Sequence, residues 1–181
     1  MSGSPGSLAD HVCLTAIAEG PTHGWALVKQ LRPDGDLGRI WSLSRGLTYR
    51  SIERLVESGS VIRRDGVRRT ILEATPAGRG VADDWLREPV GHIRDLRTEF
   101  LLKLRLHTRS GLDPRPLVQR QRDLLEPALG ALTTGSPDDP VGLWRQESAM
   151  AAQRFLDRIG EHMEGEATGE SEASESAIRA D

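Results

Sequence analysis

The chain has 181 residues, of which 37% are hydrophobic and 28% charged, and its formal net charge is −3. This length corresponds to a domain and a half at most, since about 100–200 residues per domain is usual. The only cysteine, Cys13, excludes a disulfide framework and a cysteine-based zinc site, and it suits a reducing compartment. No apolar stretch approaches the roughly 20 residues that span a bilayer, and the first residues lack the pattern of a signal peptide. We therefore expect a soluble, cytoplasmic protein.

Charge is distributed unevenly along the chain. Residues 1–110 carry 17 Lys and Arg against 13 Asp and Glu, whereas residues 111–181 carry 7 against 14. Between Arg39 and Arg69 there are 8 basic and 3 acidic side chains. A local basic stripe attracts polyanions even when the whole chain is acidic. The net charge therefore does not exclude nucleic-acid binding.

The first part of the chain predicts three helices. Residues 1–7 are rich in Gly, Ser and Pro and are expected to be disordered. Apolar spacing predicts a helix over residues 8–19, and Thr22 is a candidate N-cap for a second, short helix. A third helix is expected to start at Ser42 or Ser44 and to stop at Gly59. On a helical wheel its inward side holds Thr48, Ile52, Leu55 and Val56, and its outer side holds Gly46, Leu47, Arg50 and Arg54.

A cationic hairpin is predicted next. Residues 61–64 and 67–73 have the composition of short strands, and Asp65-Gly66 between them is a strong two-residue turn signal. Four arginines flank this turn and repel one another unless an anion lies between them: Arg63, Arg64, Arg68 and Arg69. Three helices followed by a basic hairpin are the order of a winged helix-turn-helix.

The rest of the chain predicts more helices and an acidic tail. Thr75-Pro76 is a good helix start, and longer amphipathic segments cover about 92–108, 116–132 and 141–163. Residues 164–181 are rich in Gly, Ser, Glu and Ala and are expected to be disordered. The fold class is mainly α, with a disordered leader at 1–7, a winged-helix domain at 8–90, a helical domain at 91–163 and the tail.

Four segments in the correct order resemble the PadR family of transcriptional regulators. Leu14-Thr-Ala-Ile-Ala-Glu-Gly-Pro-Thr-His-Gly-Trp-Ala-Leu resembles the opening helix and its Gly-Pro-x-His-Gly-(Tyr/Trp)-x-Leu motif. Trp41-Ser-Leu-Ser-Arg-Gly-Leu-Thr-Tyr-Arg-Ser-Ile-Glu-Arg-Leu looks like the third helix, Leu72-Glu-Ala-Thr-Pro-Ala-Gly-Arg like the wing exit, and Phe100-Leu-Leu-Lys-Leu like the helix that opens the C-terminal part. The chain departs from the family pattern at Thr48, usually aliphatic, at Leu47, often polar, and in its short wing tip.

The resemblance implies a homodimeric, DNA-binding repressor that recognises an inverted-repeat operator. One winged helix per protomer would contact a half-site, and the C-terminal helices would pair the protomers. Many relatives lose DNA affinity when a small-molecule effector or another stress signal is sensed. No cofactor is implied.

The third helix is expected to enter the major groove with its N-terminal end first. Arg45 is the best candidate for bidentate recognition of guanine, and Leu47 for contact with a thymine methyl. Ser44 or Thr48 would reach a base edge or a phosphate. Phosphate contacts, which set register without reading sequence, are expected from Tyr49, Arg50 and the wing arginines Arg64 and Arg68.

The C-terminal helices are interpreted as the dimer interface, because their apolar faces exceed what a compact domain of this size can cover. The interface residues are expected to be Leu101, Leu104, Leu125, Trp144 and Phe155. Trp85 and Trp144 are candidates for an effector pocket, although large aromatics at helical spacing are more often core. Trp25 and Trp41 fit the winged-helix core pattern and are interpreted as structural.

Two other classes of function are considered. Five scattered histidines form no metal-binding pair, and no nucleophile or phosphate-loop motif is present, so an enzyme is not expected. The alternative is a dimeric protein-interaction module that keeps the fold without reading DNA, which Thr48, the short wing and the acidic tail favour. The tail could also compete with DNA for the wing, or simply aid solubility.

Overall fold

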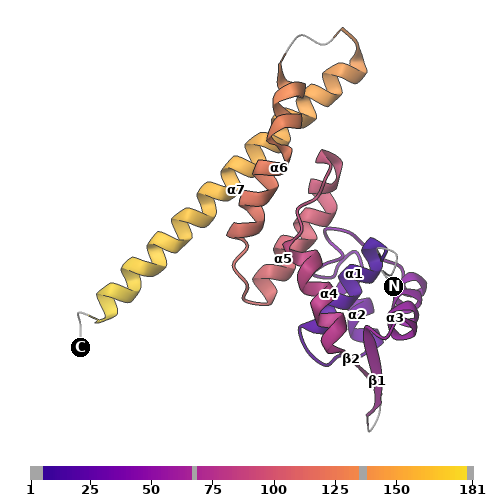
Figure 1. The fold of residues 1–181 in the computed structure, drawn as a ribbon. Helices are drawn as coiled ribbons and strands as arrows, with labels where there is room; N and C mark the ends of the chain where they lie inside the picture. The colour runs from indigo at the N-terminus through magenta and orange to yellow at the C-terminus, as the bar shows by residue number, and fades with distance from the viewer. Residues whose placement is uncertain (1–5, 67–68, 135–137, 179–181) are drawn as a thin grey trace. The chain divides into compact units, whose positions relative to one another are not determined.

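The computed structural model describes residues 6–66, 69–134 and 138–178 (Figure 1). It confirms a mainly α-helical fold with one two-stranded antiparallel sheet. The elements in chain order are α1 (Leu8–Ala18), α2 (Gly24–Leu31), α3 (Arg45–Glu57), β1 (Val61–Asp65), β2 (Thr70–Ala74), α4 (Pro76–Arg87), a 3-10 turn (Ile93–Asp95), a π-helical turn (Leu96–Phe100), α5 (Leu101–Arg109), α6 (Arg115–Thr133) and α7 (Pro140–Ile178). None of the helices in the described ranges is long and apolar enough to cross a membrane.

The chain divides into two compact units that interleave in the sequence. The first runs through Glu88 and includes Arg94–Asp113, and the second contains Pro89–Ile93 and the chain from Pro114 onward. The sequence places the boundary between residues 90 and 91, so the structure differs in assigning α5 to the winged-helix unit. The reason is that the Leu102 and Leu106 side chains of α5 are fully buried in the core of that unit.

Side-chain caps explain where the helices of the first unit begin. Ser44 caps α3 through the Leu47 amide, Thr75 caps α4 through the Gly78 amide, and Gly59 has the positive φ expected after α3. The cap predicted at Thr22 is wrong. His23 caps α2 by accepting a hydrogen bond at Nδ1 from the Ala26 amide (3.1 Å), because the backbone of Thr22 is paired with Leu72 of β2.

Helix α1 lies at the centre of the first unit and packs against α3, α4 and β2. The segment 1–7, expected to be disordered, ends in the N-cap of α1, where Ser7 and Asp10 form a reciprocal capping box. Residues 1–5 lie outside the described residues. Below the cap, Val12, Cys13 and Ile17 are fully or almost fully buried. This packing fixes the face that α3 turns away from the core.

Salt bridges attach α5 to the same unit. Arg105 donates to both oxygens of Asp36 in the segment between α2 and α3, and Arg109 pairs with Asp36 and Glu19. Lys103 is 1% exposed and donates to Glu99 Oε1 (2.9 Å) and to the Glu88 carbonyl (2.7 Å). Burial lowers the pKa of this lysine, an effect that its bond to Glu99 opposes.

The hairpin register differs from the predicted one. Arg64 pairs with Ile71 and Asp65 with Thr70, and Gly66 bonds the Arg69 carbonyl, so Asp65-Gly66 is not a two-residue turn. The buried side chains Val61, Leu72 and Ala74 select this register, since a shift by one residue would turn them to solvent. Residues 67–68, between the two strands in the sequence, lie outside the described residues. Figure 1 shows the hairpin projecting beyond α3 and α4.

The second unit is built on the antiparallel pair α6 and α7. Its core contains Leu117, Leu125 and Leu129 from α6 with Ala149, Ala152 and Leu156 from α7. The buried amide of Gln121 accepts from the Val90 N–H and donates to the Val90 carbonyl, and so attaches the 89–93 segment. Helix α7 continues through Ile178, whereas the composition predicts disorder from residue 164. Ala and Glu in this segment are good helix formers, and extending a helix needs no new nucleus.

Candidate nucleic-acid interface

The outer face of α3 carries the side chains expected to meet DNA. Arg45, Leu47, Tyr49 and Arg50 are all exposed, with 44% of Leu47 and 36% of Tyr49 accessible, and the Ser44 cap precedes them. The opposite face packs through Ile52 and Leu55. The residues are thus brought together on one surface, as predicted.

The prediction that Thr48 contacts DNA is wrong. Its side chain is fully buried, and its Oγ1 donates to the Ser44 carbonyl one turn earlier (3.0 Å). The residue therefore fills a core position of α3 and cannot reach a base edge or a phosphate in this conformation. Its hydroxyl explains how a polar residue is accepted there, since a buried donor needs a partner.

Arg45 lies between two aromatic rings. Its guanidinium carbon is 5.9 Å from the ring centre of Trp25 and 5.7 Å from that of Tyr49. Cation–π contacts at this range hold the guanidinium near the surface. Trp25 is 41% exposed, so its assignment to the core is wrong. On a helical wheel Trp25 lies away from the buried Leu27, Val28 and Leu31 of α2. This spacing could have predicted that Trp25 is exposed.

Gly24 makes room for this arrangement. A Cβ at residue 24 would lie 2.7 Å from Cε1 of Tyr49, closer than non-bonded carbons approach. A larger residue would displace the Tyr49 ring that contacts Arg45. The Gly of the His-Gly-Trp sequence therefore serves the geometry of the α3 surface.

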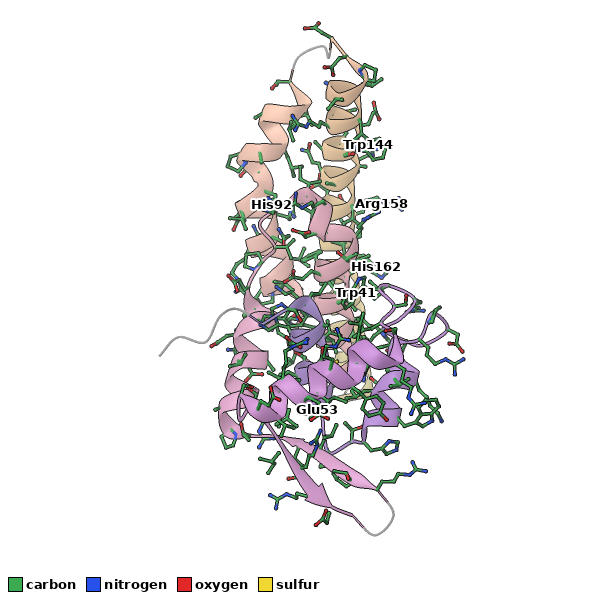
Figure 2. The ribbon with its side chains drawn as sticks, turned by 90° about the vertical axis from the view of Figure 1, so that its right-hand side faces the viewer. Trp41, Glu53, His92, Trp144, Arg158 and His162 are labelled. Carbon is green, nitrogen blue, oxygen red and sulfur yellow. The ribbon has the colours of Figure 1, made fainter. Side chains whose placement is uncertain are left out.

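Two of the four wing arginines are paired with acids. Arg63 bonds Glu53 on α3 (2.5 Å) and Arg64 bonds Glu73 on β2 (2.5 Å), and Figure 2 shows Glu53 on the side of α3 next to the hairpin. The expectation that four arginines repel one another is therefore wrong for Arg63 and Arg64, whose charges are balanced by these acids. Arg64 is 62% exposed and keeps room for a second contact. Arg68 lies outside the described residues, and Arg69 turns toward His23 (2.8 Å).

An ion pair orients α3 on α1. Arg54 donates from Nε and Nη2 to the Asp10 carboxylate (3.1 and 2.6 Å), and Nη2 also contacts Ser51. Burial raises the pKa of Asp10, but hydrogen bonds from Arg54, Ser7 and Ser51 outweigh it and hold that pKa below its ordinary value. Arg54, predicted on the outer face of α3, is thus a structural residue.

The predicted interface residues separate into two groups. Leu104 and Leu125 are 7% and 2% exposed and are buried within the protomer. The prediction that these two leucines contact a second copy is therefore wrong. Leu101 is half-buried on α5. Trp144 on α7 is 73% exposed, and Phe155 is half-buried beside an apolar hollow on the same helix. Figure 2 shows Trp144, Arg158 and His162 along α7.

Trp85 does not fit the predicted effector role. It is 6% exposed, stacks on His11 with ring centres 5.5 Å apart, and donates from Nε1 to Glu99 (2.9 Å). Nζ of Lys103 lies over the Trp85 ring, 4.8 Å from its centre. A cavity of about 510 Å³ lies instead between α6 and α7 and is lined by Gln119, Arg122, Asp123, Glu126, Leu129, Gly130, Thr133, Gln153, Leu156 and Asp157. Neither predicted tryptophan lines it.

Within the described ranges, no three His, Cys, Asp or Glu side chains gather as a metal site. The Cys13 thiol is buried among apolar side chains of the first unit, and this burial raises its pKa to about 12. The exposed face of α3 and the hairpin therefore remain the candidate site.

Comparison with known proteins returns no matching family model and no matching curated protein. Among solved structures, Bacillus subtilis PadR in complex with operator DNA is 17% identical, with a TM-score of 0.45 over 90% of this chain and 97% of that one. The same protein in complex with p-coumaric acid is 18% identical (TM-score 0.41, 90% and 99% covered), and a PadR-like transcriptional regulator from Bacillus cereus is 16% identical (0.41, 87% and 99%). Over about 90% of its length the chain is thus similar to PadR and PadR-like transcriptional regulators, the family that its sequence motifs resemble.

Proposed function

We propose that the protein is a DNA-binding transcriptional regulator that reads the major groove with the outer face of α3. The observation that carries the proposal is Arg45, held between Trp25 and Tyr49 on an exposed helix face. A guanidinium restrained in this way loses little freedom when it forms a bidentate bond to guanine. Leu47 beside it suits a thymine methyl, and Ser44, Tyr49 and Arg50 suit phosphate or base-edge contacts.

The wing adds contacts whose strength depends on its ion pairs. Arg64 would leave or share Glu73 when a phosphate approaches, and Arg68 completes the proposed wing contacts. A dimer that neutralises about eight phosphates would show log Kobs falling with log salt at a slope near −7, from about −0.9 per phosphate. The same ion pairs support the second candidate function, a winged-helix module for protein contacts, because they reduce the free positive charge of the wing.

The proposed regulator acts as a homodimeric repressor on an inverted repeat. The apolar side of α7 supports pairing with a second copy, since Trp144 is largely exposed and Phe155 and Ile159 border the hollow on that helix. Replacing Trp144 and Phe155 by alanine should lower the dimer fraction in sedimentation equilibrium. Leu124→Ala, an exposed leucine on α6 (48%), is the matched control and should leave it unchanged.

A small-molecule effector that releases DNA is proposed to occupy the cavity between α6 and α7. Its wall combines Arg122, Asp157 and amide groups with the apolar side chains Leu129 and Leu156, which suits a small ligand with polar ends. Trp144 lies on α7 but does not line this cavity, and Trp85 has no part in the proposed effector site.

The test of function is capture of sheared genomic DNA by the purified full chain. Recovery of one inverted-repeat site that is lost in Arg45→Ala but kept in Arg32→Ala would support the proposal. Arg32 is the matched control because it is also exposed, in the same unit, and pairs only at the surface with Asp34. Weak recovery without sequence preference, equal in all three proteins, would refute sequence-specific reading and favour the interaction module.

A further inference from the structure

His23 at the start of α2 contacts Arg69 of the wing. Neither neutral tautomer of the imidazole can accept hydrogen bonds at both of its nitrogens, yet each nitrogen faces an N–H donor. Nδ1 of His23 accepts from the Ala26 amide (3.1 Å), so it carries no proton, and the proton of the neutral ring is on Nε2. Nε2 lies 2.8 Å from Nη1 of Arg69. A guanidinium only donates, so two N–H donors face each other.

The other tautomer does not resolve this conflict. A proton on Nδ1 would let Nε2 accept from Arg69 but would face the Ala26 amide with a second donor and remove the cap of α2. An anion beside the pair satisfies both donors at once if the two N–H groups turn to the same side, so that its oxygens accept from Nε2 and from the guanidinium. Phosphate matches this need, because a guanidinium binds its oxygens with short, charge-assisted bonds.

The two donors are held in place by the backbone. Thr22, directly before His23, bonds to Leu72 of β2 in both directions, with N···O distances of 3.1 and 2.7 Å. This bridge fixes the start of α2 against the strand that Arg69 leads into. Two residues after His23, the Trp25 ring contacts Arg45 of α3. The pair therefore lies between the helix face and the wing of the candidate interface.

Among the described side chains, no carboxylate is paired with His23 or Arg69. In the part of the chain that the structure describes, Arg63 and Arg64 are bound to Glu53 and Glu73, whereas neither Arg69 nor His23 forms an ion pair with an acid. We propose that His23 and Arg69 together bind one backbone phosphate of duplex DNA. This inference rests on the proposed function, and it gives the family-like His-Gly-Trp segment a contact with the DNA backbone in this chain.

The first test uses inorganic phosphate as the probe on the full chain with ¹⁵N-labelled histidine. NMR should show His23 with its proton on Nε2, and phosphate should shift that nitrogen, whereas sodium chloride at equal ionic strength should not. The shift should disappear in Arg69→Gln. Absence of any shift beyond that caused by chloride would overturn the anion site.

The second test measures binding to a duplex long enough to span two major grooves, as a function of salt. His23→Asn keeps an oxygen that caps α2 but loses the Nε2 donor, and Arg69→Gln loses the charge. Each should lower affinity about tenfold, and the double variant should lose little more, since both residues hold the same phosphate. Arg69→Gln should reduce the salt slope by about 0.9 per protomer, while Arg32→Gln should change neither quantity.

The two tests separate the possible failures. If wild-type protein binds the duplex and both variants bind it equally well, the His23–Arg69 inference is wrong and the proposed function stands. If the protein binds no duplex but phosphate still shifts the His23 nitrogen through Arg69, the DNA function fails and the site is one for free phosphate. Loss of affinity with an unchanged salt slope in Arg69→Gln would overturn the phosphate contact.

Discussion

Replacing Asp10 by asparagine removes the carboxylate that holds α3 against α1, and its cost can be worked from the structure. Asp10 is 8% exposed and receives Arg54 through Nε and Nη2. Hydrogen bonds to charged groups are worth about 1.5–3 kcal/mol. The Arg54 side chain is 43% exposed, which reduces this value through solvent screening. Asparagine keeps an oxygen for the capping box with Ser7, so we expect a loss of about 1.5 kcal/mol in the free energy of unfolding.

The assay is urea denaturation followed by tryptophan fluorescence in a Trp144→Phe background, in which the remaining tryptophans all lie in the first unit. Asp34→Asn is the matched control, because its surface pair with Arg32 is worth about 0–1 kcal/mol at most. The folded pKa of Asp10 is lowered, so its contribution is present above its unfolded pKa and is lost as pH falls through the folded pKa. The deficit of Asp10→Asn should therefore shrink below about pH 4. Equal stability of the two variants at pH 7 would refute the reasoning.

Two further outcomes concern buried groups of the first unit. Because burial raises the pKa of Cys13 to about 12, a thiol reagent at pH 8 should label almost none of the native protein and one equivalent in denaturant; rapid native labelling would contradict this packing. Lys103→Ala should destabilise the protein by about 3 kcal/mol, since it leaves the Glu99 carboxylate without its cation, with only the Trp85 indole as a donor, and the Glu88 carbonyl without the lysine. Lys103→Met fills a similar volume, so its loss of stability in thermal unfolding should be no larger than that of Lys103→Ala. A larger loss would contradict the view that filling this buried space is favourable.

Local patterns predicted the helices of the winged-helix unit and the caps of α3 and α4, but not the cap of α2, which is His23. Ser44 and Gly59 bound α3, and Thr75-Pro76 opens α4, because caps and turns depend on neighbours within a few residues. Helical spacing placed Leu47 and Arg50 on the outer side of this helix, and both are exposed. These features need no information from distant parts of the chain.

The errors came from contacts between distant residues. The hairpin register depends on which side chains reach the core, and Asp65-Gly66 gave a locally strong but wrong turn signal. Arg54 points outward on a wheel, yet it pairs with Asp10, 44 positions earlier. Trp25 is apolar and was assigned to the core, but the core position on that turn is taken by Leu27. None of these pairings has a short-range pattern in the sequence.

The interleaving of the two units limits how the chain can be divided. A protease that cuts once in the loop around Gly111 would release α6 and α7 but leave Val90, the partner of the buried Gln121 amide, on the other fragment. The C-terminal fragment would then expose an amide whose two partners have gone. A fragment ending at Glu88 would instead lose α5, with Leu102 and Leu106 from its core and the arginines that bind Asp36. Recombination that exchanges one unit for another therefore has no single breakpoint that leaves both units complete.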